Sequence, residues 1–252
     1  MGDLFWLTDE QMERLRPFFP KSHGRARVDD CRVLSDIIFI NRNGLRWRDA
    51  PREYGSHKTL YNRWKRWGAM GIFAQMTDGL LAGKAKPQTN MIDAAYLKAH
   101  RTASSLRPKK GDPGRLIGRT KGGMNTKPHA ITEQNGRALS FFMTAGQISD
   151  YTGADALMDS LPAAQWMLGD RGYDADWFRD ALEKKGIKPC IPGQRSHGRP
   201  VKYDRRKYKR RNRIEIMFGR LKDWRLLATR YDRCPTVFFS AICLAATVMF
   251  WL

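Results

Sequence analysis

The stretch Met91–Leu97 (MIDAAYL) is the point at which helical periodicity gives way to strand periodicity. Before it, as far as about Gly83, apolar residues recur at the spacing of amphipathic helices. After it, two runs at 126–131 and 138–144 flank an Asn-Gly pair at 135–136, which is a strong signal for a hairpin turn. We therefore expect this stretch and the two runs to be the first three strands of one sheet.

Helices and strands alternate beyond the hairpin. The expected elements are a helix at 153–161, a short strand at 166–168, a helix at about 175–185, a strand at 188–191 and long helices in the remainder. Three strands followed by this alternation predict an α/β domain with a mixed sheet flanked by helices. Residues 101–123 are basic and rich in glycine, and we expect a loop there.

These patterns divide the chain into three parts. Residues 1–83 are predicted to form a small all-α domain of helix-turn-helix type, with Thr8 as the N-cap of its first helix. Residues 84–90 are polar and are predicted to be a linker. Residues 91–252 are then predicted to form a single α/β domain.

One predicted helix, Ser56–Trp67, carries basic and aromatic residues in alternation. Its cations are Lys58, Arg63, Lys65 and Arg66, and its aromatic residues are Tyr61, Trp64 and Trp67. One side of such a helix can pack while the other meets DNA phosphates or base edges, which is typical of a recognition helix. The alternative is an ordinary amphipathic helix with a solvated basic face.

The charge balance indicates a polyanionic partner. Lys and Arg number 46 against 25 Asp and Glu, which gives a formal net charge of +21. Nucleic acid and anionic membranes are the usual partners of such an excess, and a merely soluble basic protein is the alternative. The four cysteines form no C-x-x-C pair, so we expect neither a zinc site nor a disulfide framework, and free thiols suit a cytoplasmic protein.

The segment Pro235–Leu252 is almost uncharged and has two interpretations. It is long enough to be weighed as a membrane anchor. Thr236, Ser240 and Thr247 dilute its hydrophobicity, however, which favours a buried helix that closes the core. We therefore expect no membrane partner, and the N-terminal residues do not have the pattern of a secretion signal.

Two aspartates stand where a carboxylate needs an explanation. Asp93 lies inside an apolar run, where burying a carboxylate is costly unless it is paired or binds a metal. Asp170 follows an apolar strand, and ligands of open α/β sheets bind outside the carboxyl ends of strands. The alternatives are a structural buried Asp93 and a helix-capping Asp170.

A predicted C-terminal helix carries an acid among cations. At about 100° per residue, Tyr208, Arg211, Glu215 and Lys222 fall within about 60° of one another on a helical wheel. The acid could hold a metal while the cations and the phenol meet phosphate oxygens. The alternative is a surface stripe of ion pairs, because Arg211 and Glu215 are one helical turn apart.

The spacing Y-x2-R-x3-E-x6-K, met by these four residues, resembles the YREK signature of DDE transposases of bacterial insertion sequences. Asp93-Ala94 resembles the first aspartate of that family. The residues Asp170–Tyr173 (DRGY) resemble the block that holds its second aspartate. Asp112 and Asp150 lie close enough along the chain to be alternatives for the first acid.

The resemblance implies a ribonuclease-H-like fold in which Asp93, Asp170 and Glu215 are the catalytic acids and bind two Mg²⁺ or Mn²⁺ ions. It implies that Arg211 and Lys222 position phosphates and that Tyr208 donates to the scissile group or stacks on a base. The helical domain would recognise the terminal inverted repeats of the element, and a homodimer or larger synaptic assembly would cut two ends and join them to target DNA. Alternatives are a DNA-binding repressor without catalysis and a nuclease of the same fold.

Overall fold

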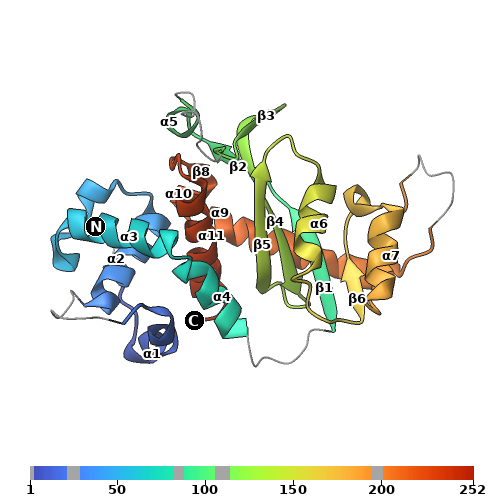
Figure 1. Cartoon of the computed structure of the whole chain (residues 1–252), viewed down its shortest axis with the longest axis horizontal. Helices are drawn as coiled ribbons and strands as arrows, with labels where there is room; N and C mark the ends of the chain where they lie inside the picture. Colours follow the sequence, from blue (N-terminus) through green and yellow to red (C-terminus); the bar gives the residue numbers. More distant parts are fainter. Residues whose placement is uncertain (1–2, 22–28, 82–87, 106–113, 195–200) are drawn as a thin grey trace. The chain divides into compact units, whose positions relative to one another are not determined.

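The computed structural model describes residues 3–21, 29–81, 88–105, 114–194 and 201–252. The chain divides into two compact units (Figure 1). The helical unit comprises Met1–Ala82, His100–Ser105 and Leu221–Leu252. The sheet unit comprises Gly83–Ala99 and Leu106–Arg220.

The helical unit is built almost entirely from helices. They are α1 (Asp9–Leu15), η1 (Arg16–Phe18), α2 (Asp30–Asn43), η2 (Trp47–Asp49), η3 (Arg52–Tyr54), α3 (His57–Ala69), α4 (Ile72–Leu81), α5 (Arg101–Ser104), α10 (Arg225–Ala228) and α11 (Pro235–Phe250), with the short strand β8 (Thr229–Arg230). Thr8 and Gln11 cap α1 reciprocally, and Gly44 ends α2 at a left-handed φ of 72°. The predicted N-cap Thr8 is confirmed.

The core of the helical unit forms around α11. This helix is buried along most of its length and packs against α4, α3 and α2. Thr77 of α4 and Thr247 of α11 share a buried hydrogen bond of 3.1 Å, so the hydroxyls that dilute the apolar segment are used inside the protein. The predicted closing helix is confirmed, and no described helix is long and apolar enough to cross a membrane.

The compact units differ from the predicted range 91–252. Leu221–Leu252 group with the helical unit, because α11 buries its apolar surface against helices from the first part of the chain. Hydrophobic periodicity predicts that a helix will be buried, but it does not tell against which partner.

The sheet unit contains the elements that position the acids. They are β1 (Thr89–Ala94), β2 (Leu97–Ala99), β3 (Gly118–Thr120), β4 (Gly123–Glu133), β5 (Ala138–Ala145), α6 (Asp150–Met158), β6 (Trp166–Leu168), η4 (Arg171–Tyr173), α7 (Asp176–Lys184), β7 (Lys188–Cys190), α8 (Arg205–Tyr208), η6 (Lys209–Arg211) and α9 (Asn212–Lys222), whose last two residues are counted with the helical unit.

The strand order is β5-β4-β1-β6-β7, and β2 and β3 also pair with β4. β4 is antiparallel to β1 and β5, whereas β6 and β7 run parallel to β1. In Figure 1, α6 lies over one face of the sheet and α9 passes behind it. This is the expected ribonuclease-H-like mixed sheet flanked by helices.

Two predicted segments differ in detail. The stretch 91–97 is not one strand, because the chain leaves β1 after Ala94 and resumes as β2 at Leu97, with Tyr96 exposed between them. The expected loop at 101–123 holds α5, β3 and the start of β4 among its described residues. Short elements of this kind are too brief for a periodicity to identify.

Candidate active site

The strands β1 and β6 are parallel neighbours in the sheet (Figure 1), and Asp93 lies near the carboxyl end of β1 while Asp170 comes just after β6. In the register of β1 and β6, Met91 is paired with Leu168. Asp93 comes two residues after Met91, and Asp170 comes two residues after Leu168. The two aspartates therefore lie at the same level along the strand direction. The crossover through parallel strands therefore brings together two acids that are far apart in the sequence.

Asp93 is a nearly buried carboxylate with two partners. Its Oδ1 accepts from the Ala94 N–H at 2.9 Å, and its Oδ2 accepts from Arg211 Nη1 at 2.7 Å. Burial raises the pKa of the Asp93 carboxyl to about 6, against the lowering effect of the Arg211 charge. The charge of Asp170 raises this pKa further, as expected for two carboxylates near each other.

Asp170 also caps the helical turn that follows it. Its Oδ1 accepts from the Gly172 N–H at 2.8 Å at the start of η4. The capping interpretation of Asp170 is therefore correct as far as it goes, and the position beside Asp93 is an additional property. The carboxyl group is half-buried, at the end of a strand whose last residues are buried.

Glu215 lies on α9 and is linked to Asp93 through Arg211. The Arg211 guanidinium binds Asp93 with Nη1 and Glu215 with Nη2. The Arg211 and Asp93 side chains are 14% and 15% exposed, whereas Glu215 is 55% exposed. The site is thus a cation held between two acids, one from a strand and one from a helix, with a third acid beside the first.

The predicted single helix for residues 208–222 is wrong in one respect. A 3-10 turn, η6, separates α8 from α9, so Tyr208 and Glu215 do not belong to one regular helix. A 3-10 turn advances by about 120° per residue, which breaks the uniform helical wheel. Arg211, the last residue of this turn, still lies one turn before Glu215 and keeps the contact between i and i+4.

The other two residues of the YREK spacing lie near this site along the chain. The Tyr208 ring is half-buried, stands 5.4 Å from the Tyr203 ring and receives the Arg211 guanidinium at 5.9 Å from its centroid. Lys222 is the last residue of α9 and is exposed.

The acidic side chains fit a divalent cation by their chemistry, since carboxylate oxygens are the ligands that Mg²⁺ and Mn²⁺ prefer. Among the described residues, no three acidic, histidine or cysteine side chains are grouped closely enough to hold one ion as they stand. The Arg211 guanidinium instead bonds both Asp93 and Glu215. Asp93 and Glu215 carry like charges, so a positive charge such as that of Arg211 is needed to hold the two carboxylates near each other.

A further carboxylate, Asp150, lies beside Asp170. A Cβ built on Gly172 would be 3.0 Å from Asp170 Oδ1 and 3.3 Å from Asp150 Oδ2, so both acids lie against the same glycine. Asp150 Oδ1 is 3.1 Å from the Nζ of Lys127, a nearly buried lysine of β4 that also donates to the Ile148 carbonyl at 2.6 Å. The sequence indicated Asp150 only as an alternative first acid. Its ion pair with Lys127 could have been suspected, because a lysine inside a buried strand needs an acidic partner.

Asp112, the other alternative for the first acid, lies outside the described residues. Of the remaining two, Asp93 contacts Arg211 and lies in the strand next to β6. Asp150 is neutralised by Lys127. Each of the two acids is thus paired with a cation, and Asp93 differs in sharing its cation, Arg211, with Glu215.

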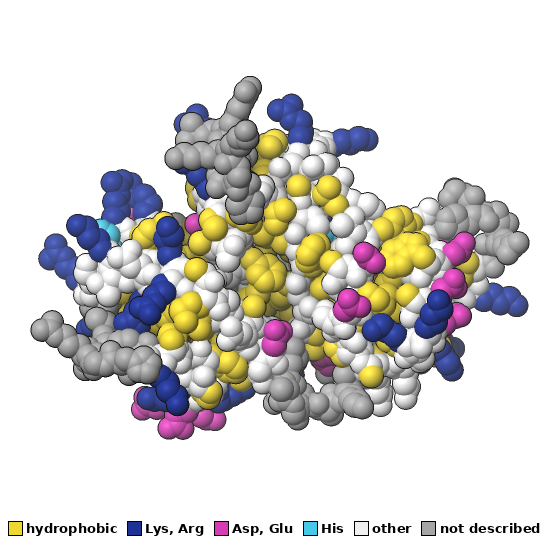
Figure 2. All heavy atoms as spheres, viewed as in Figure 1, with side chains coloured by type: hydrophobic (Ala, Val, Ile, Leu, Met, Phe, Trp, Pro, Cys, Tyr) yellow, Lys and Arg dark blue, Asp and Glu magenta, His cyan; other side chains and the backbone are white. Residues whose placement is uncertain are grey.

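The basic residues predicted for DNA binding lie on α3, in the helical unit. Lys58, Lys65 and Arg66 are exposed. Arg63 differs, because its Nη1 bonds Asp30 Oδ1 at 2.8 Å and its guanidinium lies 5.5 Å from the Trp67 ring centroid. Arg63 therefore ties α3 to α2 and is only 14% exposed. On the face shown in Figure 2, Lys and Arg side chains gather over α2 and α3, whereas acidic ones gather over α1.

Comparison with known proteins gives matches over both ends of the chain. Residues 7–77 match the family described as "Putative transposase of IS4/5 family", and residues 167–252 match "Transposase DDE domain". The "Putative transposase for insertion sequence element IS6501" of Brucella ovis is 32% identical over 131 residues, which are 51% of this chain and 99% of that protein. The chain belongs to the insertion-sequence transposases.

A further relative agrees with this assignment. The "Putative transposase for insertion sequence element IS402" of Burkholderia cepacia is 25% identical over 199 residues, which are 66% of this chain and 91% of that protein. Among solved structures, the Mos1 strand transfer complex is 11% identical, with a TM-score of 0.28 over 94% of this chain and 82% of that one, which is a weak likeness. The matched DDE domain contains Asp170 and Glu215 but not Asp93, so the choice of Asp93 rests on the sheet register.

Proposed function

We propose that this transposase binds the terminal inverted repeats of its element, cuts the DNA there and joins the freed ends to target DNA. Asp93, Asp170 and Glu215 are the catalytic acids in this proposal. The observation that carries it is the parallel register of β1 and β6, which brings Asp93 and Asp170 to the same level, with Glu215 linked to Asp93 through Arg211.

The three carboxylates would hold divalent ions, Mg²⁺ or Mn²⁺, in the number of two that the family resemblance implies. When bound, such ions supply activation of the attacking oxygen and stabilisation of the leaving oxygen of an in-line displacement. The attacking oxygen is that of water in the cutting step and that of the freed 3′-hydroxyl in the joining step. No covalent enzyme intermediate is needed for either.

Arg211 has two roles in succession. In the present arrangement it neutralises Asp93 and Glu215. A divalent ion would replace this neutralising charge, and the guanidinium would then be free to bind phosphate oxygens of the DNA in its bidentate geometry. Tyr208, which stacks against Arg211, and Lys222, at the exposed end of α9, are the other candidates for contacts to the phosphate backbone.

The helical unit supplies recognition of duplex DNA in this proposal. Lys58, Lys65 and Arg66 offer three exposed cations along α3, and base-edge contacts would come from the same face of that helix. Because two element ends must be cut together, we expect a homodimer or a larger synaptic assembly. In a bacterial cell, the cutting and joining of DNA would take place in the cytoplasm, at the nucleoid.

The test is cleavage of duplex DNA that carries the element ends, with and without Mg²⁺ or Mn²⁺. We expect metal-dependent cutting by the wild type and none by Asp93→Asn, Asp170→Asn or Glu215→Gln, although all four proteins bind the DNA. Asp155→Asn is the control, because Asp155 is an exposed acid of α6 away from the three acids along the chain. Tight binding without cutting in any of the proteins would instead favour a repressor.

A further inference from the structure

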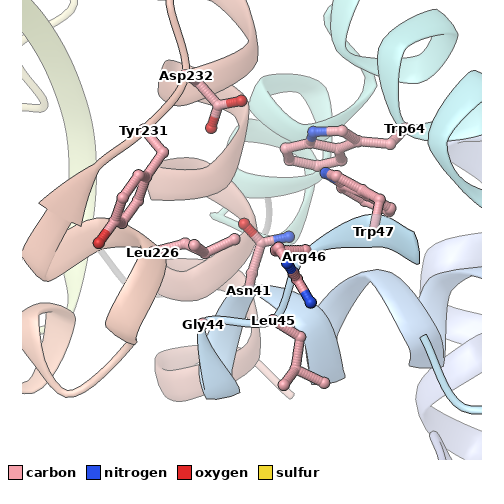
Figure 3. A pocket seen from close by; sticks show the side chains of 9 residues that line it. All are labelled: Asn41, Gly44, Leu45, Arg46, Trp47, Trp64, Leu226, Tyr231 and Asp232. Carbon is pink, nitrogen blue, oxygen red and sulfur yellow. The ribbon is translucent and has the colours of Figure 1, made fainter. Parts of the chain in front are cut away.

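A cavity of about 410 Å³ lies in the helical unit, and none of Asp93, Asp170 and Glu215 is among the residues that line it. Figure 3 shows that its lining comes from the end of α2, from η2, from α3, from α10 and from the residues after β8. Its size falls within the range of small-molecule binding sites. Neither the proposed catalytic acids nor the basic residues of α3 account for it.

Two of its sides are aromatic. Trp47 stands on one side and is held by Trp64, with ring centroids 6.1 Å apart and planes inclined by only 28°. Tyr231 stands on the other side, half exposed, and is held by His100 with ring centroids 4.6 Å apart (Figure 3). Flat, supported aromatic walls are suited to a flat aromatic ligand, because stacking on them needs little further ordering.

Two of the polar side chains that line the cavity, Asn41 and Asp232, offer hydrogen-bond acceptors, and Arg46 is a donor at its edge with the adjoining hollow. Asn41 is buried and donates its Nδ2 to the Ile37 carbonyl at 2.8 Å, which fixes the side chain and leaves its Oδ1 as an acceptor. No described residue donates a hydrogen bond to the Asp232 carboxylate, since Arg230 Nε bonds the Asp232 backbone carbonyl instead. Burial raises the pKa of Asp232, against the lowering effect of the Arg230 charge.

A cationic hollow adjoins the cavity. It shares Arg46, Trp47 and Asp232 with the cavity and is lined in addition by Arg48, His57 and Lys58. His57 and Lys58 are the first two residues of the 13-residue helix α3, so the hollow lies beside the N-terminal end of this helix. Cations beside a helix N-terminus attract phosphate groups.

We propose that this cavity binds one unpaired nucleotide of a DNA strand, with the base stacked between Trp47 and Tyr231 and the phosphate in the adjoining hollow at Arg48 and Lys58. Two acceptors on the edge of the base call for two donors on the ligand, and the N1–H and 2-amino groups of guanine supply them. Thymine offers one donor and two acceptor carbonyls, so it is the poorer ligand. The inference deepens the proposed function, on which it rests, by giving the helical unit a second mode of DNA recognition.

The test is equilibrium binding of short single strands to the full chain without divalent metal, measured by fluorescence anisotropy at one fixed salt concentration. One strand is all thymidine and the other carries a single central guanosine. We expect the wild type to bind the guanosine strand about tenfold more tightly, which is the typical effect of one good bidentate base contact. The all-thymidine strand measures the general attraction of the basic protein for phosphates.

Two variants separate the edge contact from stacking. Asp232→Asn is expected to abolish the preference for guanosine, because the new amide presents a donor to the base, while the all-thymidine strand binds as before. Tyr231→Ala is expected to weaken both strands by about tenfold through lost stacking. Glu13→Gln, which removes one exposed negative charge from α1, is the matched control and should behave as the wild type. Circular dichroism confirms that each variant is folded.

Equal affinity of the wild type for the two strands would overturn the proposal, and so would a guanosine preference that survives in folded Asp232→Asn. Deoxyguanosine monophosphate that binds as tightly as the guanosine strand would assign the cavity to a free nucleotide instead of DNA. The binding assay contains no divalent metal, and the cleavage assay compares variants of the three acids, none of which lines the cavity. The proposal can therefore fail while the cleavage assay succeeds, or stand while that assay fails.

Discussion

The guanidinium of Arg211 holds two acids that come from different elements, Asp93 on β1 and Glu215 on α9. We expect Arg211→Met to lower the free energy of unfolding by about 2 kcal/mol, which is below the usual cost of breaking a buried pair because Glu215 is half exposed. Protonation of Asp93 limits the loss further. Urea unfolding at neutral pH measures it, with Arg210→Met, an exposed neighbour, as the control. Equal stability of the two variants would contradict this role of Arg211.

Asp36 of α2 is a buried carboxylate whose two oxygens have no hydrogen-bond partner among the described residues. Burial raises its pKa to about 7, whereas the unfolded value is near 4. The folded state therefore keeps a proton that the unfolded state releases, and stability falls as the pH rises through this window, by about 1.4 kcal/mol per unit of pKa difference.

Asp36→Asn is expected to remove this pH dependence, because the amide does not titrate. Unfolding free energies at about pH 5 and about pH 8 measure it, and the wild type should lose stability between them relative to the variant. Glu13→Gln serves as the control for loss of one exposed acid. A parallel pH profile of Asp36→Asn and wild type would show that Asp36 is not the titrating group.

Among single residues, the sequence predicted which acids to consider, but it did not predict which side chains contact them. Asp170 and Glu215 stand in recognisable spacings, and Asp93 stands out as a charge in an apolar run. The bond from Arg211 to Asp93 joins positions 118 residues apart, and no pattern within one helix contains such a contact. Helical spacing showed only the partner of Arg211 one turn away, Glu215.

At the scale of elements, α3 shows that a basic helix face need not be uniform. Arg66 is exposed, whereas Arg63 is bonded to Asp30 and stacked on Trp67. We expect Arg66→Ala to weaken binding of duplex DNA and to reduce its salt dependence by about one phosphate contact, with unchanged thermal stability. Arg63→Ala should instead lower the melting temperature.

Filter binding over a series of salt concentrations and thermal denaturation of the same two variants check this pair of predictions. If Arg63→Ala has the melting temperature of the wild type and loses only DNA affinity, then Arg63 does not stabilise the packing of α3 on α2.

The hairpin turn between β4 and β5 also supports α9. Gly136 has a φ of +83°, and a Cβ there would lie 2.9 Å from the backbone carbonyl of Arg213. Gly186 has a φ of +73° with nothing within 4 Å of its Cβ position, so Gly186→Ala measures backbone strain alone. We expect Gly136→Ala to be more destabilising than Gly186→Ala by about 1 kcal/mol or more, because Arg213 must shift as well.

Chemical denaturation of both glycine variants measures this difference in the free energy of unfolding. Equal losses of stability would mean that Arg213 and α9 can shift at no cost. The turn itself was predictable, since an Asn-Gly pair between two strands fits a tight hairpin. Its contact with α9 was not, because steric contact between distant elements leaves no local pattern.

At the scale of the whole molecule, the sequence predicted a helical first part and a mixed sheet after it, and both are present. The assignment of Leu221–Leu252 was harder. These residues follow the sheet unit along the chain but pack with the first helices, because the apolar surfaces of α4 and α11 complement each other. The matched DDE domain, residues 167–252, accordingly runs through parts of both units.

We propose that Asp93, Asp170 and Glu215 form one site for both cutting and joining DNA, and the joining step separates this proposal from its alternatives. The measurement uses a pre-cut element end with a free 3′-hydroxyl, a supercoiled plasmid target and Mg²⁺, and compares wild type with Glu215→Gln. We expect joined product from the wild type and none from the variant, with equal binding of the end. Joined product from both proteins would contradict the role of Glu215, and cutting of uncut ends without joining of pre-cut ones would mean that the protein is a nuclease.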